Sequence, residues 1–194
     1  MEEKNSTYDA IISRRSIRRF QQKPISLDML KKLVNAGRLA PSGANLQPLE
    51  FVVVTDEELC SKVFDTLGWA GYIKPSWSPA VSETPVAYIV VLVRDGVSRW
   101  FERDVGFASE NIVIAAESMD IGSCVLCKID KDRIQEVLQV PSGLKVDSVI
   151  ALGYKAEKSV AEDMDDSVKY WRDEDGVLHV PKRKLEDVLH VNGF

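Results

Sequence analysis

The chain has 194 residues, a length typical of one domain, and its 45% hydrophobic and 28% charged residues are those of an ordinary soluble protein. A net charge of −5 argues against general affinity for nucleic acids or anionic membranes, and the longest apolar runs are too short to cross a bilayer. The three cysteines indicate no disulfide framework and the polar N-terminus is unlike a secretory signal, so we expect a cytoplasmic protein without nucleic-acid or membrane partners.

Apolar periodicity and capping residues divide the chain into helices and strands. Ser6 with Asp9 predicts a short helix to about Arg15, and Ser26 predicts the start of a second helix that ends near Pro41. The other predicted elements are a strand over 49–55, a helix over 56–68, a loop or lid over 69–84, a strand over 85–94, a central helix over 99–122, a strand over 123–129, a helix over 131–140, a strand over 148–156, and a charged tail with a turn at 173–176. Without a G-x-G-x-x-G or P-loop motif, this order indicates an α+β fold.

The stretch "RRSIRRF", residues 14–20, contains four arginines in an acidic chain. These cations could simply complement the dipole at the end of the first helix. Ser16 favours a second interpretation, because a hydroxyl beside guanidinium groups suits a phosphate. A further basic cluster, Lys182, Arg183 and Lys184, lies in the tail. Since a phosphate monoester carries nearly two charges and several acceptor oxygens, the two clusters could hold one phosphate from both sides.

A second stretch, "APSGANLQPLEFVVV" at 40–54, is rich in amide and hydroxyl groups immediately before a predicted buried strand. Its polar residues could serve only as a helix stop and turn. Ser42, Asn45 and Gln47 could also hydrogen-bond the polar edge of a flat heterocycle. Together the two stretches predict an aromatic cofactor that carries a monophosphate.

Five stretches in this order resemble the nitroreductase family of flavin-dependent oxidoreductases: "RRSIRRF", "APSGANLQPLEFVVV", "DVGFASENIVIAAESMDIGSCVL", "IALGYKAE" and "PKRKLEDVLH". The resemblance covers nearly the whole chain. It implies an α+β fold with a central mixed or antiparallel sheet flanked by helices, and an intertwined homodimer with FMN in two sites at the interface. We therefore expect one flavin-binding domain over 1–194, whose extension over 157–194 packs on the partner subunit.

The resemblance also implies roles for individual residues. Arg14, Arg15 and Ser16 would hold the phosphate and ribityl chain. Arg18 would approach the pyrimidine edge of the flavin, where a cation stabilises the negative charge of the reduced ring. The partner subunit would contribute Pro41, Ser42, Gly43 and Asn45, with Gln47 beside them. The ring would lie along Val125, Leu126, Cys127 and Lys128, with the backbone N–H of Cys127 or Lys128 facing flavin N5. The phosphate would also be bound by Lys182, Arg183 and Lys184.

The implied reaction needs no catalytic side chain, because flavin N5 carries the chemistry. NADH or NADPH would deliver hydride and leave, and a planar, electron-poor acceptor of the nitroaromatic or quinone type would then take it in a ping-pong mechanism. Two alternatives stay open. One is a flavin storage or sensor protein without turnover, and the other is a relative that performs dehalogenation, azoline oxidation or flavin fragmentation.

Cys124 and Cys127 have C-x-x-C spacing, but the apolar spacer and the predicted strand favour two buried small hydrophobes over a redox pair. Zinc would need two more ligands, and the remaining candidates Cys60, His179 and His190 are widely scattered, so no metal site is predicted.

Other polar and aromatic residues have two interpretations each. Asp104 and Glu110 on the long helix are interpreted as paired or solvated rather than as general acids. The aromatic residues Trp69, Tyr72, Trp77 and Trp100 belong either to an interface core or to a slot that covers the flavin.

Overall fold

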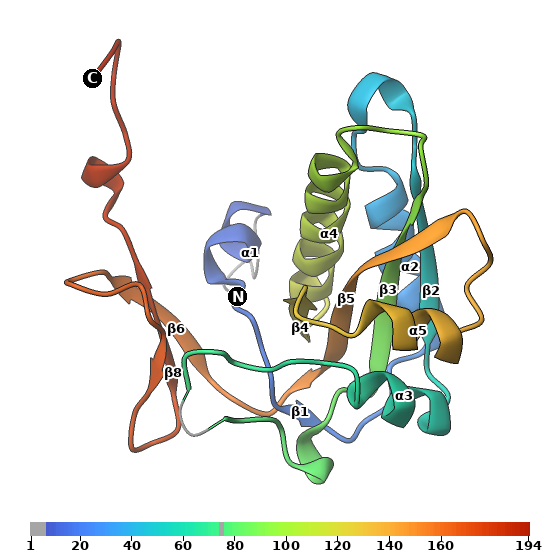
Figure 1. Ribbon diagram of the computed structural model, residues 1–194. Coiled ribbons are helices and arrows are strands. Elements are labelled where there is room, and N and C mark those ends of the chain that lie inside the picture. The colour runs from blue at the N-terminus through green and yellow to red at the C-terminus, as the bar shows by residue number, and fades with distance from the viewer. Residues whose placement is uncertain (1–6, 74–75) are drawn as a thin grey trace.

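The computed structural model describes residues 7–73 and 76–194, so the expected cap at Ser6 lies outside the described residues. The helices are α1 (Thr7–Ser13), α2 (Leu27–Arg38), α3 (Glu57–Phe64), α4 (Phe101–Ser118) and α5 (Lys131–Val137). The strands are β1 (Phe20–Gln21), β2 (Leu49–Val54), β3 (Ala87–Arg94), β4 (Ile121–Leu126), β5 (Leu144–Lys155), β6 (Ser159–Asp163), β7 (Trp171–Arg172) and β8 (Leu178–Lys182). Helices and sheet together confirm the α+β class (Figure 1).

The body of the molecule is built on a five-stranded sheet whose central strand is β5. β5 pairs antiparallel with β3 on one side and with β4 on the other, and its last residues also pair with β1. β2 pairs antiparallel with β3 and lies at the edge. The paired strands are thus all antiparallel.

Helices cover both faces of this sheet. Leu30 of α2 and Ile112 of α4 are fully buried on one face, and Val63 of α3 and Ile134 of α5 are fully buried on the other. Successive residues of β3 alternate between the two cores, which explains why the strand is apolar up to Val93.

Several element boundaries differ from the sequence prediction. α1 ends at Ser13 rather than near Arg15, and α4 ends at Ser118 rather than at 122. The chain reverses at Asp120, whose positive φ of 58° cannot continue a helix, and β4 begins at Ile121 instead of 123. In contrast, α2 begins as predicted, because Ser26 Oγ accepts a hydrogen bond from the Met29 N–H over 3.3 Å.

The sequence analysis did not predict β1, which anchors the arginine-rich segment. Phe20 of β1 is fully buried and packs directly on Gly153 of β5, where an added Cβ would lie 2.7 Å from the Phe20 ring. The pairing extends beyond the strand, because the Ala156 N–H donates to the Arg19 carbonyl over 2.9 Å. The start of the chain is therefore fixed on the end of the sheet.

Residues 159–194 form an arm that stands apart from the body in Figure 1. Its three-stranded sheet has the order β6-β8-β7, with β6 parallel and β7 antiparallel to β8. The predicted turn at 173–176 is confirmed, since the Gly176 N–H donates to the Asp173 carbonyl over 3.1 Å.

His179 of β8 joins the strands of the arm. Its Nδ1 lies 2.8 Å from Glu162 Oε2, its Nε2 lies 3.0 Å from Asp173 Oδ2, and its ring stacks on Trp171 at 4.3 Å. Hydrogen bonds to Asp173 and then to Glu162 raise the pKa of His179 above its ordinary value. None of the helices described is long and apolar enough to span a bilayer.

Candidate functional site

The segment between α1 and β1 runs beside β4. Ser16 forms an isolated parallel bridge with Ser123, and the Ile17 N–H donates to the Ser123 carbonyl over 2.9 Å. Ile17 is buried directly against Gly122, where an added Cβ would lie 3.1 Å from its side chain. The glycine in β4 thus allows the close approach that places the arginines beside this strand.

The arginines of this segment have different partners. Arg15 donates to the carbonyls of Ile12 and Arg14, so this residue does complement the end of α1. Burial, and then the charge of Arg14, lower the pKa of Arg15. Arg14 Nε lies 3.7 Å from Glu110 Oε1, in an ion pair whose glutamate is exposed.

Arg14 and Arg18 also carry buried N–H donors that make no hydrogen bond within the described part of the chain. Among the described residues, neither Arg14 Nε nor Arg18 Nε has a hydrogen-bond partner. The Arg18 guanidinium stacks on Tyr170, with its central carbon 5.0 Å from the ring centroid. A buried N–H that makes no hydrogen bond costs about 1–3 kcal/mol, so these donors suit an anionic ligand.

The end of β4 supplies both buried and open positions. Val125 is 39% exposed, whereas Cys124 and Leu126 are buried. The strand ends at Leu126, so Cys127 and Lys128 lie beyond it and are exposed. The interpretation of Cys127 as a buried hydrophobe was therefore wrong, because the ladder stops one residue before it.

The thiols of Cys60, Cys124 and Cys127 are free, and burial raises the pKa of Cys124. The Lys128 carbonyl accepts the Gly68 N–H over 2.8 Å, which joins the segment that follows β4 to the segment that follows α3. Within 7–73 and 76–194, no group of three or more His, Cys, Asp or Glu side chains is suited to hold a metal ion.

The loop over 41–47 is held on the N-terminal end of α4 by Asp104. This carboxylate is 2% exposed and accepts the Gly43 N–H over 2.9 Å and the Ser98 hydroxyl over 3.3 Å. Asp104 is thus paired, as predicted, and so is Glu110.

Backbone strain is concentrated in the same loop. Ala44, Asn45 and Gln47 have φ values of 50°, 55° and 49°, a conformation that non-glycine residues rarely adopt. Pro41, Ser42 and Gln47 line a cavity of about 150 Å³ beside Asp104. Strained backbone of this kind is often found at binding sites.

The predicted site residues contact α4 at different positions along the helix. The 41–47 loop contacts α4 at Asp104. Arg14 contacts the same helix at Glu110, and Arg15 interacts electrostatically with Glu117 of that helix. At 1.5 Å per residue, these contact points lie roughly 9 and 20 Å from Asp104 along the helix.

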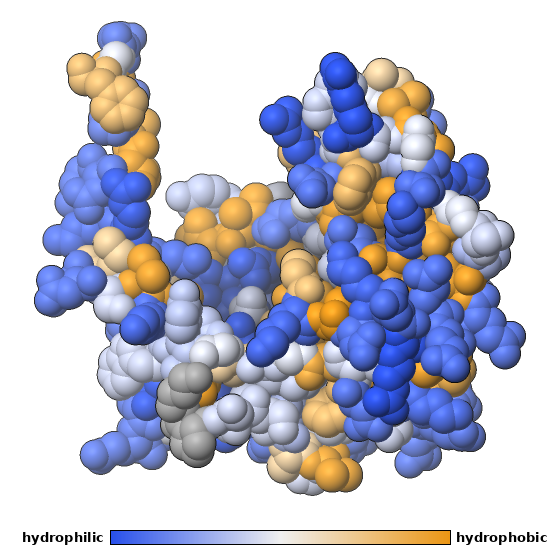
Figure 2. All heavy atoms as spheres, in the orientation of Figure 1, coloured by the Kyte–Doolittle hydropathy of each residue, from blue (hydrophilic) through white to orange (hydrophobic). Residues whose placement is uncertain are grey.

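The basic residues of the tail are exposed on the arm, which a broad hollow separates from the body in Figure 2. These residues are Lys182, Arg183 and Lys184. The tail beyond them exposes the apolar side chains of Leu185, Val188, Leu189, Val191 and Phe194.

The loop over 69–84 divides its aromatic residues between core and surface. Trp69 is buried beside Phe64, with ring centroids 5.8 Å apart. Tyr72 contacts Tyr170 of the arm at 5.0 Å. Trp77 lies within cation–π range of Arg19 and Arg172, at 5.7 and 5.6 Å from its ring centroid. The loop therefore connects the arginine-rich segment to the arm.

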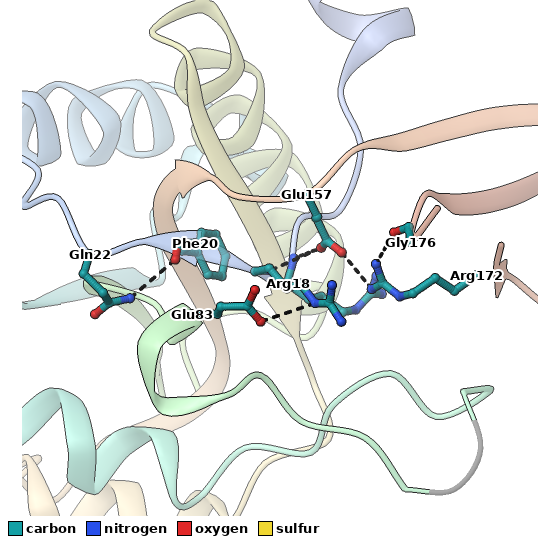
Figure 3. Close-up of polar contacts among 8 residues, drawn as sticks. Arg18, Phe20, Gln22, Glu83, Glu157, Arg172 and Gly176 are labelled. Atoms are coloured by element: carbon teal, nitrogen blue, oxygen red, sulfur yellow. Dashed lines mark hydrogen bonds and ion pairs between the residues drawn. The ribbon is translucent and has the colours of Figure 1, made fainter. Parts of the chain in front are cut away.

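Sequence reasoning missed the carboxylate at the centre of this region. Glu157 accepts hydrogen bonds from the backbone N–H groups of Arg18 and Arg19 and from the guanidinium of Arg172 (Figure 3). A glutamate in a charged tail gives no local signal of such a role, because its partners are distant in the sequence.

The sequence profile of the nitroreductase family matches residues 11–154. The chain belongs to the nitroreductase family. It is 32% identical over 164 residues to a candidate NADH dehydrogenase/NAD(P)H nitroreductase from Archaeoglobus fulgidus, a match that covers 80% of this chain and 89% of the relative.

Solved structures of other nitroreductases share the fold. A candidate NADH dehydrogenase/NAD(P)H nitroreductase from Parabacteroides distasonis superposes with a TM-score of 0.73 at 26% identity, over 98% of this chain and all of that one (100%). A protein from Clostridium difficile R20291 named FMN-dependent nitroreductase superposes with a TM-score of 0.70 at 24% identity, over 96% of this chain and 99% of that one. The family profile ends at residue 154, so the arm lies outside it.

Proposed function

We propose that this nitroreductase-family protein is an FMN-dependent oxidoreductase that uses NADH or NADPH to reduce a planar, electron-poor acceptor of the nitroaromatic or quinone type. The observation that carries the proposal is that the buried Nε–H donors of Arg14 and Arg18, beside β4, make no hydrogen bond to any of the described residues. The name of the Clostridium difficile structure, FMN-dependent nitroreductase, supports the choice of cofactor.

The donor set of the site fits FMN. Arg14 and Arg15 offer guanidinium groups beside the Ser16 hydroxyl, a combination suited to a phosphate with several acceptor oxygens. Arg18 would lie at the pyrimidine edge of the ring, with Val125, Leu126, Cys127 and Lys128 along it. When bound, FMN would supply a two-electron carrier that accepts hydride from NAD(P)H and releases it to the acceptor.

The roles of this chain's residues would then be binding, orientation and charge stabilisation. Arg14 and Ser16 would fix the phosphate end, and Arg18 would stabilise negative charge that develops at the opposite end. The half-exposed Val125 would form part of the surface under the ring. Trp77 and Tyr72 would limit the space above it to planar acceptors.

We further propose that a second copy of the chain completes the site. The distance along α4 between the arginines and the 41–47 loop supports supply of Pro41, Ser42, Gly43, Asn45 and Gln47 by the partner. Lys182, Arg183 and Lys184 would reach the phosphate as the exposed apolar tail residues become buried on the partner subunit. The extension over 157–194 would thus serve assembly, and the dimer would work in the cytoplasm.

The first test is the absorbance spectrum and light scattering of the purified protein. We expect a yellow dimer that releases FMN on denaturation and oxidises NADH or NADPH when nitrofurazone or menadione is added. A colourless protein that takes up no added FMN would refute the proposal. FMN binding without NAD(P)H oxidation would instead favour the storage or sensor alternative.

Substitution of the two arginines separates their roles. Arg14→Ala removes a charge-assisted hydrogen bond and should weaken FMN binding about ten- to a hundredfold, with little change in flavin potential at saturating FMN. Arg18→Ala should lower the potential, because the reduced flavin loses a neighbouring cation. The matched control is Arg94→Ala, which removes an exposed arginine paired with Glu50 at 2.7 Å on the edge strand. If both variants keep the wild-type FMN affinity and flavin potential, the two arginines only complement the end of the first helix.

A further inference from the structure

Glu157 is a buried carboxylate at the junction of the body and the arm. Its side chain is 1% exposed, and it follows the end of β5. Burying a carboxylate costs several kcal/mol unless its lone pairs are satisfied. Oε1 accepts from the backbone N–H groups of Arg18 and, over 3.2 Å, of Arg19, and Oε2 accepts from Arg172 Nη2 over 2.7 Å (Figure 3).

The partners of Glu157 leave the Arg18 guanidinium available to a ligand. Glu157 binds the backbone of Arg18 and uses the guanidinium of Arg172, rather than that of Arg18, to balance its charge. Arg18 therefore keeps its guanidinium free of a carboxylate partner among the described residues, stacked on Tyr170 and with Nε unpaired. A carboxylate that accepts two consecutive N–H groups also restrains the backbone torsions between them, and so the direction of the Arg18 side chain.

Arg172 extends this restraint to the arm. Its Nη1 donates to the Gly176 carbonyl over 2.6 Å, within the β7–β8 hairpin. On the other side, its guanidinium shares the Trp77 ring with that of Arg19. The backbone of Arg18, the 69–84 loop and the base of the arm thus meet around the Glu157–Arg172 pair.

We propose that Glu157 is a positioning residue, which holds the backbone of Arg18 so that the guanidinium of Arg18 is presented to the bound flavin, and which ties that position to the arm through Arg172. The inference rests on the proposed FMN site. It adds that the cation beside the flavin is oriented by a group that does not itself touch the cofactor.

The sign of a change in flavin potential tests this role. Glu157→Gln removes a negative charge near the site, which by Coulomb's law alone would stabilise the reduced, anionic flavin and raise its potential. Loss of the Arg18 position should instead lower the potential, the change that we also expect from Arg18→Met. Glu157→Asp keeps the charge but shortens the side chain, so it should also lower the potential. A raised potential in Glu157→Gln, or an unchanged one in Glu157→Asp, would overturn the proposal.

Coupling between the two residues provides a second readout. We expect Glu157→Gln to weaken FMN binding about tenfold in the wild-type background and less than about twofold in an Arg18→Met background, because coupled residues are not additive. Equal effects in both backgrounds would show a purely structural role. Glu50→Gln is the matched control, since it breaks an exposed ion pair between Glu50 of the edge strand β2 and Arg94 of β3.

Amide hydrogen exchange separates this inference from the proposed function. If the wild-type protein binds no FMN, the proposed function fails, yet the hold of Glu157 on the backbone can still be measured. The amides of Arg18 and Arg19 should exchange faster in Glu157→Gln and Glu157→Asp than in the wild-type protein. Unchanged exchange at these amides would refute the restraint itself, even if the wild-type protein binds FMN.

Discussion

Gly153→Ala should destabilise the protein by driving β1 away from β5. An added Cβ would lie 2.7, 2.8 and 2.9 Å from Cδ1, Cβ and Cγ of Phe20. Phe20 cannot turn toward solvent, because it is fully buried and pairs with Lys155. The ring must instead move by several tenths of an ångström in a packed core, and such overpacking costs about 1–3 kcal/mol.

Urea unfolding followed by tryptophan fluorescence measures this loss, at one protein concentration for all variants. Gly71→Ala is the matched control, since no heavy atom lies within 4 Å of its added Cβ, and its stability should stay within about 0.5 kcal/mol of wild type. The double variant with Phe20→Leu should be less destabilised than the sum of the single changes, because the two sites are in contact. Wild-type stability of Gly153→Ala would refute the claim that β1 is fixed by this contact.

Three further predictions concern the arm, the strained loop and the cysteines. The pKa of His179 is raised by its two carboxylates, so its stabilisation of the arm is complete below the unfolded pKa of about 6.5 and is lost as pH rises through the higher folded pKa. Proton NMR titration of the two histidines, with His190→Gln to assign their signals, should give His179 a titration midpoint above pH 6.5. A midpoint at or below pH 6.5 would contradict the stabilisation of protonated His179 by Glu162 and Asp173. Ala44→Gly should stabilise the protein by up to about 1 kcal/mol in urea unfolding, because glycine adopts the positive φ of this position without strain. The control Ala36→Gly, within α2, should destabilise the protein by about 1 kcal/mol. Equal losses of stability in the two variants would exclude backbone strain at Ala44. In alkylation with iodoacetamide at pH 8, the exposed Cys127 should react well before Cys60. The reason is that burial, and then the charge of Asp56, raise the pKa of Cys60 to about 11. Similar alkylation rates would contradict the burial of the Cys60 thiol.

The sequence predicted those parts of the fold whose causes are local. Ser26 starts α2 through a hydrogen bond three residues ahead, and β3 is apolar up to Val93 because both of its faces are covered. The arginine-rich segment stood out because its charge contrasts with the acidic chain. Its place beside β4 agrees with the family resemblance, while the cofactor contacts assigned to it stay a prediction.

What the sequence could not predict depends on partners far apart in the chain. The two residues of β1 carry no periodic pattern, and the strand exists because Phe20 fits over Gly153. Glu157 and Arg172 lie among many charges, and nothing local distinguishes the pair that becomes buried. Cys127 is exposed because β4 ends at Leu126, three residues before the predicted end of the strand at 129. Each of these features is set by tertiary contacts that override local preference.

The position of β5 has a consequence for synthesis on the ribosome. β5 is the last strand of the body in sequence and its central strand in space, so β1 and β4 have no strand to pair with, and β3 can pair only with β2, until residue 155 has emerged. Glu157 then binds Arg18, 139 residues back along the chain. Long-range pairing of this kind is slow and leaves strand edges open while the nascent chain waits. The arginines are therefore among the first residues made and among the last to reach their final positions, and a ribosome stalled before β5 would hold a chain with no candidate site.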